Sequence, residues 1–160
     1  MKGCAVFAPL FAALTVAAIL GSGLMAGLFF AFSTAVMAAL ARLPEGQGAA
    51  AMNAVNIVIL NPVFLAVFMG TALVSLALGA RAVLGWSQPG SAWLLAGSLF
   101  YLVGIFGVTA VFNVPLNDAL AAAPGDAQAW SRYLAEWVPW NNVRTLAGLA
   151  ALACFAMVRQ

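Results

Sequence analysis

The chain contains one long apolar stretch, "AVFAPLFAALTVAAILGSGLMAGLFFAFSTAVMAAL", which runs from Ala5 to Leu40 without a charged residue. A transmembrane helix needs about 20 apolar residues to cross a hydrocarbon core of about 30 Å. At a helical rise of about 1.5 Å per residue, this stretch is longer than that core is thick. We therefore expect a membrane helix that tilts, bends near Gly21–Gly23 or projects beyond the bilayer.

The composition of the whole chain agrees with a membrane protein. The 160 residues are 66% hydrophobic and only 6% charged, with a mean hydropathy of +1.08. A soluble domain carries about 25% charged residues, so these few charges cannot cover a water-facing surface. The net charge of +2 and the lack of a basic run argue against a nucleic-acid partner.

Three further apolar segments are long enough to span, and the four expected spans are residues 5–40, 62–80, 92–112 and 138–158. The connections between them leave no room for a soluble domain. The sequence therefore predicts a single all-α integral membrane domain over residues 1–160, built as a four-helix transmembrane bundle. Small residues such as Gly23 and Gly27 suit close packing of its helices. The sequence leaves open whether several copies of the chain form an oligomer.

The connection between the third and fourth spans reads "APGDAQAWSRYLAEW", residues 123–137. Asp126 is a good helix N-cap, and Arg132 and Glu136 form an i,i+4 pair. Another face carries apolar and aromatic residues, namely Trp130, Tyr133, Leu134 and Trp137. This pattern predicts a short amphipathic helix at the membrane interface, with its aromatic side chains at the headgroups.

An even number of spans places both termini on one side. That side carries Lys2, Arg81 and Arg159 and no acid. The opposite side carries Arg42, Arg132, Arg144, Glu45, Asp118, Asp126 and Glu136. Each side of the membrane has three Lys or Arg residues. If Arg144 lies inside the bundle and is not counted, the side with the termini has three and the opposite side has two. We therefore expect cytoplasmic termini in a bacterial cytoplasmic membrane.

Few residues here bind metals. The chain has no histidine and four acidic residues, so we expect no metal and no cofactor. Cys4 and Cys154 lie in apolar segments and are expected to be buried thiols, with a disulfide as the alternative. Met1 and Lys2 before an apolar run resemble a signal peptide, but the run is too long for one.

Strongly polar residues gather at the ends of the spans that lie opposite the termini. They are Arg42, Asn53, Asn56, Asn61, Asn113, Asn117, Asn141, Asn142 and Arg144. Trp137, Asn141 and Arg144 follow an i, i+4, i+7 spacing and share one helix face. If such faces point inward, amides, a guanidinium and indoles line one cavity.

Each of these polar residues also has a purely structural interpretation. Arg144 can extend toward water or lipid phosphate instead of lining a site, although an ionisable residue in a span is a functional candidate. Asn61 can cap the helix after it, Asn117 can form a turn, and Asn141 can bond between helices. Pro62, Pro115 and Pro139 are expected to interrupt helices at the same membrane face and to free backbone carbonyls.

Four segments together resemble a known family. They are "GLFFAFSTAVMAALARLP", "MNAVNIVILNP", "FNVPLND" and "WVPWNNVRTLAGL". In combination they are similar to the small four-span membrane family that includes the fungal anthrone oxygenases, known in bacteria as a domain of unknown function. The resemblance implies oxidation of an anthrone-like methylene by O₂ without a cofactor. The positions it carries over are Asn56, Asn61, Asn113, Asn117, Trp140, Asn141 and Arg144.

The residues suit that chemistry. Arg144 is expected to hold a phenolate or enolate, while Asn113, Asn117 and Asn141 orient oxygen atoms. Phe112, Trp137 and Trp140 are expected to stack on a planar ring, with Asn53, Asn56 and Asn61 completing the binding site. Asp118 is the best-placed general base, and Glu136 is second.

Several functions remain open from the sequence. The expected partners of an oxygenase are O₂, a hydrophobic aromatic small molecule such as an anthrone or hydroquinone, and membrane lipid. A non-catalytic binder of quinone or lipid, or a subunit of a membrane complex, needs the same pocket. A proton-coupled transporter is disfavoured, because none of the four expected spans contains an acid.

Overall fold

The structure is a computed structural model that describes residues 3–44 and 46–158, with side chains from residue 9 onward. Lys2, Glu45, Arg159 and the side chain of Cys4 lie outside this part, and so do the charge count at the termini and the alternative disulfide that depend on them. The described residues are helical apart from short connections and contain no strand. The predicted all-α bundle is confirmed.

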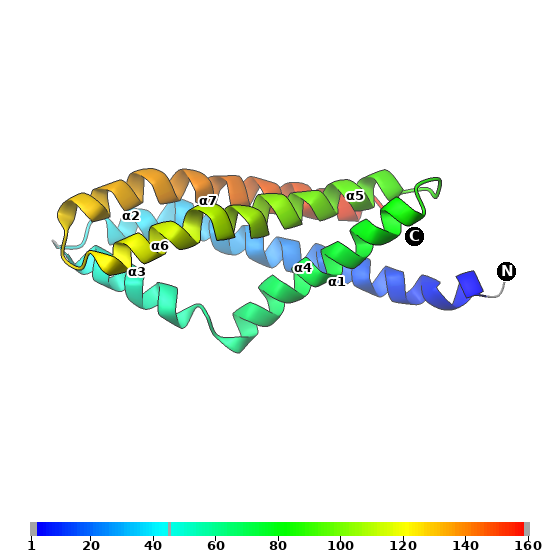
Figure 1. Cartoon of the computed structure of the whole chain (residues 1–160), viewed down its shortest axis with the longest axis horizontal. Coiled ribbons are helices and arrows are strands. Elements are labelled where there is room, and N and C mark those ends of the chain that lie inside the picture. The colour runs from blue at the N-terminus through cyan, green and yellow to red at the C-terminus, as the bar shows by residue number, and fades with distance from the viewer. Residues whose placement is uncertain (1–2, 45, 159–160) are drawn as a thin grey trace.

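Four long helical rods lie side by side, with both termini at one end of the bundle (Figure 1). The first rod joins α1 (Gly3–Ala31), a π-helical turn η1 (Phe32–Val36) and α2 (Met37–Leu40). The second bends between α3 (Gln47–Val58) and α4 (Pro62–Leu84). The third joins α5 (Ser91–Leu99), the π-helical segments η2 (Phe100–Gly107) and η3 (Thr109–Asn113), and α6 (Val114–Ala122). The fourth is α7 (Ala127–Ala156).

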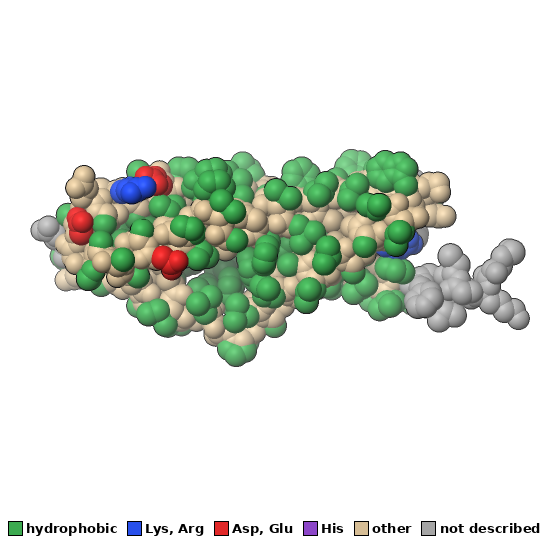
Figure 2. Space-filling view, viewed as in Figure 1, with side chains coloured by type: hydrophobic (Ala, Val, Ile, Leu, Met, Phe, Trp, Pro, Cys, Tyr) green, Lys and Arg blue, Asp and Glu red, His purple; other side chains and the backbone are tan. Residues whose placement is uncertain are grey.

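Three helical stretches among the described residues are long and apolar enough to cross a membrane, Pro9–Leu40, Pro62–Leu84 and Ser91–Ala122. On the face shown in Figure 2, charged side chains gather toward the two ends and hydrophobic ones cover the middle. These features identify an integral membrane protein. The fourth expected span, 138–158, overlaps α7, which ends at Ala156. This helix is long enough to cross but is less apolar, because Asn141, Asn142 and Arg144 interrupt it.

The structure confirms the two helix N-caps that the sequence predicted. The Asn61 side chain accepts hydrogen bonds from the backbone N–H groups of Val63 and Phe64, and Pro62 occupies the first turn of α4. Asp126 accepts from the N–H groups of Gln128 and Ala129 at the start of α7. These caps satisfy donors that have no partner inside a helix.

The prolines at 115 and 139 do not break their helices, so the expected interruptions there are wrong. Before Pro115 the helix widens, and the N–H of Val114 bonds to the carbonyl of Thr109, five residues earlier. This π-helical turn accommodates the missing donor of proline without unwinding the chain. The third rod therefore continues past residue 112 to Ala122, and α7 runs through Pro139.

The amphipathic segment 123–137 also differs from the prediction. It is helical from Ala127 onward, but it forms the first turns of α7 rather than a separate helix. Its aromatic face points into the bundle: Tyr133 and Trp137 are buried in a cluster with Met37, Met52 and Leu120. Burial of this apolar area outweighs a place at the headgroups. The predicted Arg132–Glu136 pair is present at 2.7 Å on the exposed face.

Small residues allow the rods to approach closely, as the sequence predicted for Gly23, whereas the prediction is wrong for Gly27, which has open space beside it. A Cβ atom on Gly21 would overlap the Thr71 side chain of α4, and one on Gly104 would overlap Ala147 of α7. The α1 helix is regular through Gly21–Gly23, and the irregular turn lies later, at η1. Cys154 is a buried free thiol.

Candidate functional site

A cavity of about 620 Å³ lies between the end of α1, η1, α3, the start of α4, the η3–α6 junction and α7. We call it the Arg144 cavity. Its polar lining residues are Asn53, Asn56, Thr109, Asn117, Asp118, Trp137 and Arg144. Most of the remaining wall is aliphatic or aromatic, with Phe29, Phe32 and Phe64 among its residues. The cavity thus has one polar side in a largely apolar chamber, the usual composition of a small-molecule site.

Arg144 lies just past the middle of α7 and is only 5% exposed. Nη2 donates to the amide oxygen of Asn141 at 2.7 Å, and Nη1 donates to the Thr109 hydroxyl at 3.2 Å. The guanidinium carbon lies 4.2 Å from the centre of the Phe29 ring and 5.2 Å from that of Trp137. Arg144 therefore points inward, and the alternative in which it reaches lipid headgroups is wrong.

The charge of Arg144 has no acidic partner in the described part of the chain. The ion pair found there joins Arg132 to Glu136 on the surface. Aromatic faces and neutral oxygen atoms stabilise a cation, but they do not neutralise it. A buried guanidinium without a carboxylate is costly unless an anion joins it. The cavity beside Arg144 therefore favours an anionic ligand.

Four buried polar atoms of cavity-lining residues lack a hydrogen-bond partner among the described residues. They are Asn53 Oδ1, Asn56 Nδ2, Trp137 Nε1 and Arg144 Nε. An unsatisfied buried polar group costs about 1–3 kcal/mol, so most proteins satisfy such groups. Four such atoms belong to residues of one cavity wall, so this wall has hydrogen-bonding capacity that the described residues do not use. Three are donors and one is an acceptor, which suits an oxygen-rich ligand that carries at least one hydroxyl.

Asn141 and Asn113 support the cavity but do not line it. Asn141 is fully buried and its Nδ2 donates to the Phe29 carbonyl at 2.7 Å and to the Ser33 hydroxyl at 2.6 Å. Asn113 donates to the Trp137 carbonyl at 3.4 Å, and its Oδ1 has no partner. Asn141 thus ties α7 to α1 and positions Arg144, rather than contacting a ligand.

Asn117 and Asp118 occupy adjacent places on α6. Asn117 accepts a hydrogen bond of 2.7 Å from the Tyr133 hydroxyl, which fixes the orientation of its amide. The expected turn at Asn117 is absent, because α6 continues to Ala122. Asp118 lines the cavity and is also exposed, so its carboxylate can exchange protons with the outside. Glu136, the other candidate base, does not line this cavity.

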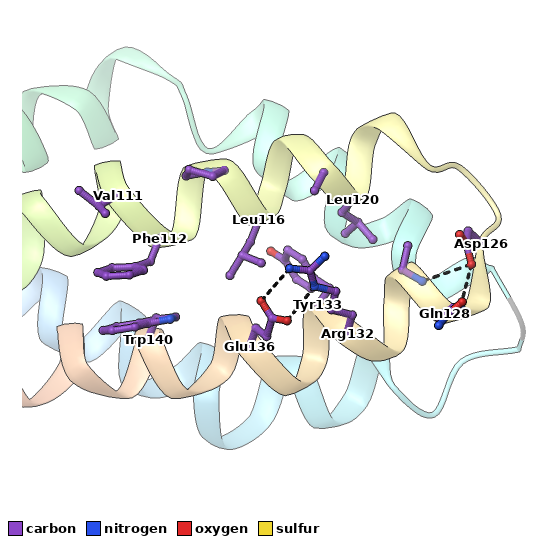
Figure 3. Close-up of a pocket in the computed structure, with 13 residues that line it drawn as sticks. Val111, Phe112, Leu116, Leu120, Asp126, Gln128, Arg132, Tyr133, Glu136 and Trp140 are labelled. Atoms are coloured by element: carbon purple, nitrogen blue, oxygen red, sulfur yellow. Dashed lines mark hydrogen bonds and ion pairs between the residues drawn. The ribbon is translucent and has the colours of Figure 1, made fainter.

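Three other predicted site residues lie elsewhere. Asn61 is exposed and is occupied as the cap of α4. Phe112 and Trp140 stack on each other, with ring centres 3.6 Å apart and planes at 9°. They line a second cavity of about 730 Å³ between α6 and the first half of α7, which also includes the Arg132–Glu136 pair (Figure 3). The structure therefore separates Phe112 and Trp140 from the polar residues of the Arg144 cavity.

Sequence reasoning missed several residues of the site. Phe29, Ser33 and Thr109 contact Arg144 or Asn141 directly, and Tyr133 orients Asn117. Thr109 carried a weak signal, because it lies one helical turn before Asn113 in the same segment. Phe29 and Ser33 are ordinary residues of an apolar helix, and only the packing of α1 against α7 shows their role.

Comparison with known proteins gives one match. Residues 62–154, more than half of the chain, match the family described as anthrone oxygenase. The match includes Asn113, Asn117, Asp118, Trp137 and Arg144, whereas Asn53 and Asn56 precede it. No curated protein and no solved structure gives a significant match.

Proposed function

Since the chain belongs to the anthrone oxygenase family, we propose that it binds a planar phenolic anion in the Arg144 cavity and oxidises it with O₂. The substrate class is an anthrone or a similar hydroquinone-like compound. One observation carries the proposal: Arg144 is buried and makes no ion pair with an acid among the described residues, although Asp118 lines the same cavity, and four polar atoms of the cavity-lining residues lack partners. A phenolate supplies both the negative charge and the oxygen acceptors that such a site requires.

The polar wall suits the developing charges of the reaction. An ionised hydroxyanthrone delocalises its charge over the ring carbon and the oxygen atoms. Arg144 Nε and Trp137 Nε1 are the unpaired donors on α7, and Asn56 lines the cavity from α3. Fixed donors of this kind stabilise an oxyanion without reorganisation during the reaction. Phe29 and Phe32 supply apolar surface for the ring.

The proposed reaction balances without a cofactor. The methylene loses one proton to a base, and the carbanion transfers one electron to O₂. The two radicals combine through a new C–O bond to give a hydroperoxide after protonation. Loss of the second methylene hydrogen and cleavage of the O–O bond then give the ketone and water. O₂ accepts all four electrons that the methylene loses, so the sum is CH₂ plus O₂ to C=O plus H₂O.

Asp118 is the proposed proton acceptor. It is a carboxylate on the cavity wall, and its exposure gives the abstracted proton a route away from the site. Tyr133 holds the neighbouring Asn117 by the hydrogen bond to its amide oxygen, so the Asn117 amide nitrogen is left as a donor near the same wall. Asn117 is therefore proposed to orient a substrate carbonyl rather than to transfer a proton.

The proposal is tested with dithranol, a dihydroxyanthrone, and purified protein in lipid nanodiscs. We expect O₂ uptake and anthraquinone formation above the rate with empty nanodiscs. Arg144→Gln should lower the rate about 10- to 100-fold, because it removes a charged hydrogen-bond donor from the cavity. Arg42→Gln, at an exposed arginine outside the cavity, is the matched control.

Equal rates for the wild type and Arg144→Gln, with both folded, would contradict the proposal. Binding that depends on Arg144 without any turnover would instead favour a non-catalytic binder of the same class of ligand.

We also propose that α7 crosses a bacterial cytoplasmic membrane together with the three apolar rods, and that both termini are cytoplasmic. In a background without Cys4 and Cys154, single cysteines at Gln88 and Gln128 report the two ends of the bundle. A membrane-impermeant maleimide added to intact cells should label the cysteine at 128 and not the one at 88. The reverse pattern would invert the proposed orientation.

A further inference from the structure

The opening of the Arg144 cavity is marked by residues that both line it and face outward. Ile57 is 75% exposed, Leu60 63% and Val114 42%, and all three are lining residues. A side chain can have both properties only at the mouth of a cavity. Asp118 lies one helical turn beyond Val114 on α6 and marks a polar edge of the same mouth. The rest of the rim is apolar.

This mouth lies at the elbow between α3 and α4. The elbow projects away from the other rods, and the surface beside it is hollowed (Figures 1 and 2). Asn61 holds the bend, because its Nδ2 donates to the carbonyls of Val58 and Ile59 while its Oδ1 caps α4. One membrane-spanning stretch starts at Pro62 beside the elbow, and Val114 lies within another, so the apolar rim adjoins segments that suit contact with lipid.

We infer that the natural ligand of the Arg144 cavity is amphiphilic: a planar acidic head with an aliphatic chain, taken up laterally from the bilayer. This inference rests on the proposed function, because the head is the phenolic anion that Arg144 holds. The unpaired polar atoms belong to the inner part of the site, and the exit runs past Ile57, Leu60 and Val114. A ligand with a polar head and an apolar chain matches both parts at once.

The chain of such a ligand acts at the rim. In a bilayer it concentrates the ligand at the depth of the opening, and its packing against the apolar side chains of the rim adds dispersion energy there. A compound without a chain satisfies the inner site but leaves the rim residues in contact with lipid alone. Chain length should therefore raise affinity through the rim, independently of Arg144.

The test uses lawsone, a hydroxynaphthoquinone that is anionic at neutral pH, and its homologue with a decyl chain next to the hydroxyl. Binding to the full chain in nanodiscs is measured by calorimetry, with the heat for empty nanodiscs subtracted. The variants are Ile57→Trp, which fills the mouth, and Val58→Trp. Val58 is the matched control, because it is 71% exposed on the same helix but does not line the cavity.

We expect Ile57→Trp to weaken binding of the decyl compound about tenfold and to change binding of lawsone less than about twofold. Val58→Trp should leave both unchanged. Equal affinities of the two compounds for the wild type, or equal effects of Ile57→Trp and Val58→Trp, would overturn the inference about the chain.

The outcome for Arg144→Gln separates the two proposals. If this variant weakens binding of both compounds while the rim variants have no selective effect, the proposed anion site stands and the chain inference fails. If Arg144→Gln leaves both affinities unchanged, the proposed function itself fails.

Discussion

The amide oxygen of Asn141 accepts a hydrogen bond of 2.7 Å from Arg144 Nη2, and both side chains are buried on the same face of α7. The amide nitrogen of Asn141 donates hydrogen bonds to the Phe29 carbonyl and to the Ser33 hydroxyl. Asn141 thus couples the first rod to the guanidinium of Arg144, which lines the cavity and whose Nε has no hydrogen-bond partner among the described residues.

Asn141→Ala should destabilise the bundle, because it leaves a buried carbonyl and a guanidinium nitrogen without partners. We expect a loss of about 1–3 kcal/mol in the free energy of unfolding. Asn142→Ala, at the exposed neighbouring position, should change it by less than about 0.5 kcal/mol. Equilibrium unfolding in detergent measures both, and equal losses would argue against the structural role of Asn141.

Trp137→Phe should weaken ligand binding while it leaves the stability of the protein nearly unchanged. The substitution keeps an aromatic ring in the buried cluster but removes an indole N–H that has no partner. We expect thermal stability within about 1 kcal/mol of the wild type, and binding of a hydroxynaphthoquinone weakened by a factor of about 3–10, the value of one hydrogen bond. Trp130→Phe, on the same helix but outside the cavity, should leave binding unchanged.

Asp118→Asn should lower turnover and leave ligand binding intact. A general base typically contributes about 10²–10⁴-fold, so we expect a loss in this range with dithranol, while affinity for a product-like anthraquinone stays the same or increases. Asp126→Asn is the control, since asparagine also caps helices well and residue 126 is outside the cavity. Unchanged turnover in Asp118→Asn would assign proton removal to solvent.

Two glycines of α1 should respond oppositely to alanine. Gly21→Ala places a methyl group against Thr71 and should cost about 1–3 kcal/mol. Gly27 has open space at the corresponding position, so Gly27→Ala should be neutral or stabilising by up to about 1 kcal/mol. Thermal unfolding of the two variants tests the packing of α1 against α4 independently of any ligand.

Much of the fold was predictable because it follows from local chemistry. The charge-free run before Leu40, the Asn61–Pro62 start of α4 and the Asp126 cap of α7 each depend on residues close together in sequence. The stripe of Trp137, Asn141 and Arg144 was also correct, because α7 is a regular helix and its 3.6-residue period holds throughout.

The errors concern the helix face and the continuity of the third and fourth rods. The π-helical turns η2 and η3 change the side-chain phase along the third rod, so spacing alone did not show that Phe112 and Asn117 face different cavities. Trp140 lies one residue before Asn141 and therefore on another face of α7. The sequence predicted a helix break at Pro115, but a widened π-helical turn accommodates this proline.

The central claim is that the Arg144 cavity stabilises a phenolate, and the ionisation of a bound ligand tests it most directly. Danthron, a dihydroxyanthraquinone, changes its visible absorption when its phenol ionises, so its pKa can be measured when it is bound to the protein in nanodiscs. A cation beside the phenol lowers this pKa, whereas burial alone raises it. We predict that bound danthron ionises at lower pH than danthron in empty nanodiscs, and that Arg144→Gln abolishes the difference. A raised pKa in the wild type, or the same lowered pKa in Arg144→Gln, would contradict the account.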